Sequence, residues 1–172
     1  MSIGNGPICI DGVQRLPDDI REYSGLDRID HADQAVLRTD LRRSAEDWAR
    51  AMFGDEPNVS ERLIWQVALR NRLEPGRSPD TIAGWRIGHR EHDRIRLESP
   101  SPILTGRLIV TTDDDLVTLT TCIRWDTRRG TAVLRALLPL HRMIVPRIVL
   151  TAVKRLMADG SASESNSSDS IA

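Results

Sequence analysis

Histidines are the side chains of this chain that are most able to carry chemistry, and four possible metal ligands lie within one short run. His89, Glu91, His92 and Asp93 stand within five residues of each other. On an extended strand His89 and His92 point to opposite faces, because their separation is odd. A metal site would need a bulge or a turn there and a further distant ligand. We therefore interpret the run as a solvated turn between two strands and predict no metal site.

Two other sets of residues also lack the spacing that a metal or cofactor site requires. The run Asp113-Asp114-Asp115 has no alternating acids, glycine or distant glutamate of a calcium loop, and short Asp runs are typical of hairpin tips. Cys9 and Cys122 are the two cysteines, too few for zinc spacing or a disulfide framework. Glycine-rich phosphate loops are absent from the sequence. No cofactor is expected.

His141 is the best single candidate for a titrating group. It falls on the apolar side of an amphipathic stretch, near Leu138 and Ile148 on a helical wheel. There it could face a cavity and serve as a hydrogen-bond partner or a general acid or base. Alternatively, it is a structural residue that meets carbonyl groups freed by Pro139 or Pro146. No Ser, Cys or Asp is paired with it by spacing, so no triad is predicted and no catalytic residue is assigned.

The elements that position these groups follow from the hydropathy periods. Ser44 and Asp47 predict a capping box for a short helix that Gly54 ends, and Asn58 predicts a second helix ended by Pro75-Gly76. Period-two patterns predict strands, and a long amphipathic helix follows with a kink or short break near Leu138 and Pro139. The expected ranges are strands over 34–41, 85–90, 94–98, 104–112 and 116–125, and the helix over 128–157.

This order of elements predicts an α+β helix-grip fold, in which a curved antiparallel sheet, two short helices and a long C-terminal helix packed on the sheet bury one core. We expect residues 1–33 to form an irregular N-terminal arm and residues 34–158 to form a single helix-grip domain. Residues 159–172 are rich in Ser and acids, which predicts a disordered tail.

The chain resembles a family of small bacterial proteins of unknown function within the START-like, Bet v 1-like (SRPBCC) helix-grip superfamily. The segments that carry the resemblance are His31–Ala35, Ala45–Gly54, Ala68–Leu73, Arg128-Arg129-Gly130 and Leu138–Pro146, in which Leu140 stands where the family usually has Phe. The resemblance implies little about activity, since the family has no agreed reaction. Its wider superfamily includes lipid carriers, polyketide cyclases and aromatases, and quinone-binding proteins.

These patterns favour binding or transport of a small apolar ligand, such as a lipid, polyketide or isoprenoid-like molecule, in a cavity between the sheet and the C-terminal helix. A cyclase- or aromatase-like enzyme with His141 as acid or base is the alternative, and an interaction module with a closed core is a third hypothesis. The ligand-binding residues predicted for the cavity are Trp85, Leu119, Thr121, Ile123, His141 and Ile144.

Charge is distributed unevenly along the chain. The whole sequence has a net charge of −1, which argues against a nucleic-acid binder, yet residues 127–158 hold seven basic residues and no acid. Arg128, Arg135 and Arg142 fall nearly in line on the helical wheel and predict contact with an anionic membrane surface or an acidic protein. No signal peptide and no run of about 18 apolar residues is evident, so a cytoplasmic protein is expected.

Overall fold

A seven-stranded antiparallel sheet forms the centre of the protein. The computed structural model describes residues 6–54, 78–100 and 102–168, and the strands lie in the order β1-β2-β7-β6-β5-β4-β3. The strands are β1 (Ile8–Asp11), β2 (His31–Arg38), β3 (Thr81–Ile82), β4 (Trp85–Arg90), β5 (Arg94–Pro100), β6 (Leu104–Asp113) and β7 (Leu116–Trp125). The helices are η1 (Val13–Arg15), α1 (Asp18–Tyr23), α2 (Ala45–Phe53) and α4 (Arg128–Ser168).

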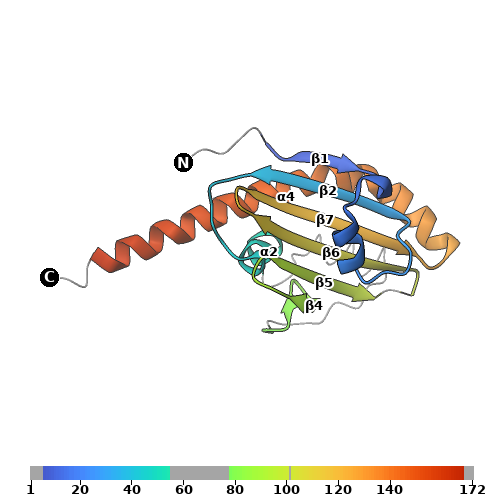
Figure 1. The fold of residues 1–172 in the computed structure, drawn as a ribbon, viewed down its shortest axis with the longest axis horizontal. Coiled ribbons are helices and arrows are strands. Elements are labelled where there is room, and N and C mark those ends of the chain that lie inside the picture. The colour runs from blue at the N-terminus through green and yellow to red at the C-terminus, as the bar shows by residue number, and fades with distance from the viewer. Residues whose placement is uncertain (1–5, 55–77, 101, 169–172) are drawn as a thin grey trace.

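Both faces of the sheet are covered, as Figure 1 shows. Helices α2 and α4 lie behind the sheet in that view, on what we call the helix-facing side, and η1 and α1 lie in front of it. Side chains that alternate along the strands divide between the two layers. Leu119 of β7 packs in the helix-facing core, whereas Cys122 of the same strand packs against Leu16 and Ile20 of the N-terminal segment. The curved antiparallel sheet with a long C-terminal helix packed on it confirms the predicted α+β helix-grip fold.

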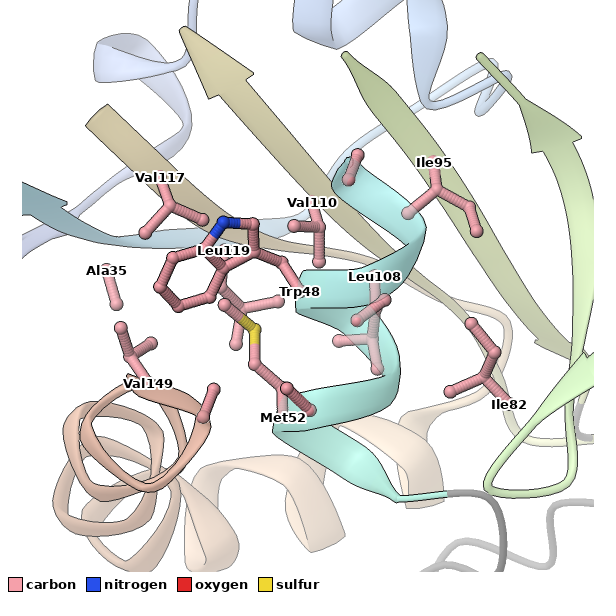
Figure 2. Packing of buried hydrophobic residues seen from close by; sticks show 14 of the residues in the cluster. Ala35, Trp48, Met52, Ile82, Ile95, Leu108, Val110, Val117, Leu119 and Val149 are labelled. Carbon is pink, nitrogen blue, oxygen red and sulfur yellow. The ribbon is translucent and has the colours of Figure 1, made fainter. Parts of the chain in front are cut away.

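Helix α2 begins at the predicted capping box. The Ser44 hydroxyl accepts a hydrogen bond from the Asp47 backbone N–H at 3.1 Å, and the Asp47 carboxylate accepts one from the Ser44 backbone N–H at 3.3 Å. The helix ends before Gly54, whose φ of 77° suits a residue without a Cβ. Figure 2 shows Trp48 and Met52 projecting from α2 among the buried residues of the sheet and α4. The short helix is therefore the centre of the helix-facing core.

Helix α4 is continuous through both of its prolines. Pro139 and Pro146 lie inside the helix, so the short break predicted near Leu138 does not occur. Figure 1 shows the helix changing direction along its length, which agrees with a kink of the kind that proline causes. At its start, a Cβ on Gly130 would lie 2.2 Å from the Ile103 carbonyl oxygen, so only glycine allows this close approach to the residue before β6. The helix extends to Ser168, beyond the end predicted at residue 157.

The N-terminal segment is more regular than its sequence indicates. Residues 1–33, predicted to be an irregular arm, contribute β1, η1 and α1, and β2 already begins at His31. Strand β1 is four residues long and forms by pairing with β2. The pairing runs from Ile8 opposite Val36 to Asp11 opposite Asp33. Such a strand has no hydropathy pattern of its own. The predicted second short helix and Trp65 lie outside the described residues.

Candidate functional site: a buried His–Asp–His cluster

The polar centre of the helix-facing side is the carboxyl group of Asp33. This residue lies in β2 with 6% of its surface exposed, on the same face as Ala35 and Leu37 of the core. His31 is two residues earlier and therefore shares that face. From α4, His141 reaches the same carboxylate oxygen: the Nε2–Oδ2 distances are 3.0 Å for His31 and 2.9 Å for His141. Two imidazoles thus meet on one buried oxygen.

The protonation pattern of this cluster follows from the chemistry of the groups. A carboxylate oxygen only accepts hydrogen bonds, so both Nε2 atoms carry a proton. Burial acts to raise the pKa of Asp33, but the hydrogen bonds from His141 and His31 and the attraction to their positive charge together outweigh it and lower that pKa from 3.8 to about 2. Asp33 is therefore ionised at neutral pH, and it orients both imidazole rings so that each Nδ1 points away from the carboxylate.

Thr121 adds an unpaired hydroxyl beside the cluster. It stands directly opposite Asp33 in the β2–β7 ladder and is 2% exposed, yet its Oγ1 atom has no hydrogen-bond partner. Its neighbour Thr120 faces the other layer, where its hydroxyl accepts a hydrogen bond from Gln34 at 3.1 Å. A buried hydroxyl without a partner is costly, and such groups are rare in folded proteins. The hydroxyl of Thr121 thus has hydrogen-bonding capacity left over for another molecule.

A path of helix-facing residues leads from the cluster across the sheet. His31 stands opposite Ile123, Ile123 opposite Gly106, and Gly106 opposite Ser99. Ser99 is buried and its hydroxyl also has no partner. The Trp85 ring comes from β4 and lies over Gly106, where an added Cβ would be 3.5 Å from the ring. The path therefore combines apolar side chains with the unpaired hydroxyl of Ser99, and the unpaired hydroxyl of Thr121 lies beside its start.

The structure distributes the six predicted ligand-binding residues over this side of the sheet and the helix above it. Thr121, Ile123 and His141 gather around Asp33, and Trp85 lies at the far end of the path. Leu119 is fully buried in the core under α2, one pair along β7 from Thr121. Ile144 lies half-buried on α4, one turn beyond His141. Their role in binding a ligand stays a prediction.

Sequence reasoning missed His31, Asp33 and Ser99. The available signal was the spacing His-x-Asp-x-Ala-x-Leu over residues 31–37, which places both polar residues on the buried face of a strand. Nothing in that spacing indicates that His141, 108 residues further along the chain, meets Asp33. The pairing arises only when α4 folds back over the edge of the sheet.

The other chemically suggestive residues have structural roles. His89 and Glu91 pair at 2.9 Å beside the exposed β4–β5 turn, as expected of a solvated connection. Asp113 ends β6 at a hairpin tip, where Asp114 pairs with Arg42 at 3.7 Å. Among the residues that the structure describes, no group of three or more His, Cys, Asp or Glu side chains is arranged to hold a metal ion.

An open groove of about 540 Å³ lies at the opposite end of the sheet from His141. The hairpin tip, the segment before α2 and the turn at His92 form its walls. Trp48 lies at its base, and charged side chains such as Arg42 and Asp114, already paired with each other, line its rim. It contains none of the residues that the sequence singled out for ligand binding.

Comparison with known proteins adds little about function. No family model and no curated protein matches the chain. Among solved structures, CalU16 from Micromonospora echinospora is similar over 88% of this chain and 93% of its own, with 14% sequence identity and a TM-score of 0.28. At that TM-score the likeness says nothing about what this chain binds or does. The helix-grip layout therefore rests on the structure itself, and the family resemblance stays a prediction.

Proposed function

We propose that the protein binds a small, largely apolar molecule carrying a hydroxyl or carbonyl group, between the sheet and the N-terminal half of α4. The observation that carries this proposal is the buried cluster of Asp33, His31 and His141 with the unpaired hydroxyl of Thr121 beside it. Binding sites for small molecules combine apolar walls with a few polar groups that fix orientation. This cluster supplies such groups on an otherwise apolar surface.

Each polar group has a distinct part in this proposal. The Thr121 hydroxyl donates to a ligand oxygen or accepts from a ligand hydroxyl, which satisfies its missing hydrogen bond. The Nδ1 atoms of His31 and His141 accept from a ligand hydroxyl when the rings are neutral. Ile123 and the Trp85 ring provide apolar contact along the path, at about 25 cal/mol per Å² of apolar surface removed from water. Lipids, polyketides and isoprenoid-like molecules have this combination of groups.

A second candidate is an acid–base enzyme of the cyclase or aromatase type. The observation that favours it is the hydrogen bond of 2.9 Å from His141 to the ionised Asp33. A carboxylate that orients an imidazole and stabilises its protonated form is a recurrent arrangement for general acid–base catalysis. In this reading His141 moves a proton at its Nδ1 atom, and Asp33 is a positioning residue.

Native mass spectrometry of protein purified from its own host tests the binding function directly. The proposal predicts a retained mass in wild type and a smaller retained fraction in Thr121→Val, because the variant lacks the hydroxyl that meets the ligand. Loss of an unpaired buried hydroxyl is neutral or stabilising for the fold, so Thr121→Val should not lower the unfolding temperature. Equal retention by wild type and Thr121→Val would contradict the proposal.

Thr120→Val is the matched control, since it removes a hydroxyl from the next residue on the other face. Its hydroxyl is hydrogen-bonded to Gln34, so the variant should be less stable but should retain the same mass. The enzyme hypothesis predicts one further difference. Wild type should convert the retained molecule to a product of different mass or absorbance. His141→Gln can still donate a hydrogen bond to Asp33 but should not convert the molecule.

A further inference from the structure

The solvent side of α4 combines exposed apolar and cationic side chains. The helix buries Val145, Val149 and Val153 against α2 and the sheet. On the opposite side Leu140 is 36% exposed and Met143 is 48% exposed, and among the described residues Ile8 is the one other exposed large hydrophobic side chain. Isolated exposed apolar residues are ordinary. Two of them one turn apart on one helix form a local apolar surface.

Beyond Leu140 and Met143, the same side of the helix carries positively charged side chains. We define the outer face of α4 as Leu140, Met143, Arg147, Leu150 and Lys154, which recur at intervals of three and four residues and so fall on one side. Arg147 and Lys154 are exposed. No acidic residue occurs between residues 127 and 158, and the first acid of the helix is Asp159, five residues beyond Lys154. The outer face is therefore apolar at one end and positively charged at the other.

Two residues of the predicted stripe of Arg128, Arg135 and Arg142 already contact other side chains. Arg142 pairs with Asp11 of β1 at 3.0 Å, and the Arg135 guanidinium lies 5.9 Å from the centre of the Trp125 ring. The cations that continue the side of the helix occupied by Leu140 and Met143 are Arg147 and, about two turns further, Lys154.

The segment also passes a test of length and composition for a membrane-crossing helix. The helix from Arg135 to Asp159 is long and apolar enough to cross a membrane, and 22% of its most apolar stretch is buried within the protein. The same segment packs Val149 and Val153 into the core and ties Arg142 to β1. The helix therefore packs one side against the protein and exposes the other side to its surroundings.

We propose that the outer face of α4 docks on an anionic membrane surface, with the helix lying in the plane of the membrane. Leu140 and Met143 enter the boundary between headgroups and acyl chains, and Arg147 and Lys154 meet anionic headgroups. Helices with this division of residues bind membranes through buried apolar area and through attraction to anionic lipid. An acidic protein would need an apolar patch beside its acids to contact Leu140 and Met143 as well as the cations, whereas an anionic membrane offers both kinds of contact.

Co-sedimentation with vesicles of equal parts phosphatidylglycerol and phosphatidylcholine, at low salt, tests the proposal. Wild type should bind these vesicles, bind pure phosphatidylcholine at least tenfold more weakly, and lose affinity as salt rises. The double variant Arg147→Glu/Lys154→Glu should bind the anionic vesicles at least tenfold more weakly, since each cation near such a surface is worth about fivefold in affinity. Arg15→Glu in η1, on the opposite layer, is the control and should bind as wild type does.

The variant Leu140→Ser/Met143→Ser separates membrane docking from simple charge attraction. Both side chains are exposed, so the variant should unfold at the wild-type temperature, yet it should bind the anionic vesicles several-fold more weakly. Wild-type binding by this folded variant would overturn the proposal, because charge attraction alone would then account for the binding. Equal binding of wild type to neutral and anionic vesicles, or none to either, would also overturn it.

Discussion

Asn at position 33 removes the charge of the buried carboxyl group while keeping its shape. Its amide oxygen can take the place of Oδ2, the atom that accepts both hydrogen bonds from His31 and His141. The substitution therefore leaves the hydrogen-bond geometry available and removes the negative charge. Any loss of stability measures what the ionised carboxylate contributes to the fold.

The size of that loss follows from the acidity of Asp33. The hydrogen bonds from the two histidines and the attraction to their positive charge together outweigh the effect of burial and lower its pKa from 3.8 to about 2. Because a tenfold change in acid dissociation corresponds to about 1.4 kcal/mol, the ionised form stabilises the folded protein by about 2 kcal/mol. For a chain of 172 residues, we expect Asp33→Asn to lower the unfolding temperature by about 4–8 °C at pH 7.

The difference between wild type and Asp33→Asn should depend on pH in one direction. A carboxyl group whose pKa is lower in the folded than in the unfolded protein stabilises the fold fully above the unfolded pKa of 3.8. That stabilisation is lost as the pH falls through the folded pKa of about 2. The two proteins should therefore differ in stability at pH 5 and above and converge as the pH falls below 4.

Urea unfolding followed by tryptophan fluorescence at a series of pH values measures this difference. Asp27→Asn is the control, because its carboxyl group pairs with Arg124 at the surface, with a side chain 76% exposed, and the substitution should change stability little at any pH. A difference between wild type and Asp33→Asn that is as large at pH 3 as at pH 7 would refute the argument from charge. It would place the effect in packing instead.

Two further predictions concern α2 and the cysteines. Ser44→Ala removes the hydroxyl that accepts from the Asp47 backbone N–H and should cost about 1 kcal/mol in urea unfolding; an unchanged midpoint would mean that Asp47 caps the helix unaided. Burial raises the pKa of Cys122 to about 12, whereas Cys9 is exposed, so a thiol reagent at pH 8 should label one cysteine in the folded protein and two in urea. Labelling of both in the folded protein would contradict the buried position of Cys122.

Local patterns predict the central strands and α2 because the deciding interactions are close in sequence. Strands β6 and β7 pair from Leu104 opposite Trp125 to Asp113 opposite Leu116, and the period-two pattern in each predicts a strand. The Asp run lies at the tip that joins them. Similarly, the capping box of α2 is formed by Ser44 and Asp47, three residues apart. In these elements local preference and tertiary packing agree.

The features that the sequence did not predict depend on contacts between distant residues. Strand β1 exists through its pairing with β2, and its four residues are too few to show a pattern. The Asp33–His141 contact joins residues on different elements, so the individual residue types can be named but not their pairing. The predicted short break near Pro139 does not occur, because the packing of α4 on both sides of the proline keeps the helix continuous.

Two consecutive residues of α4 fix how that helix is rotated on the protein. Asp11 and Asp33 stand opposite each other on β1 and β2, where two carboxylates would repel unless each were paired. His141 meets Asp33 and Arg142 meets Asp11, so both residues must turn toward this edge of the sheet.

Successive residues on a helix are about 100° apart around its axis. Because both His141 and Arg142 contact the sheet, the side of the helix midway between them faces the sheet. The opposite direction falls midway between residue 140, which precedes His141, and residue 143, which follows Arg142. Leu140 and Met143 occupy those positions, and both are exposed. The ionic contacts that assemble the candidate site thus also turn the apolar residues of the outer face away from the protein. A change at Asp33 that let the helix rotate would consequently disturb both the site and the surface proposed to meet the membrane.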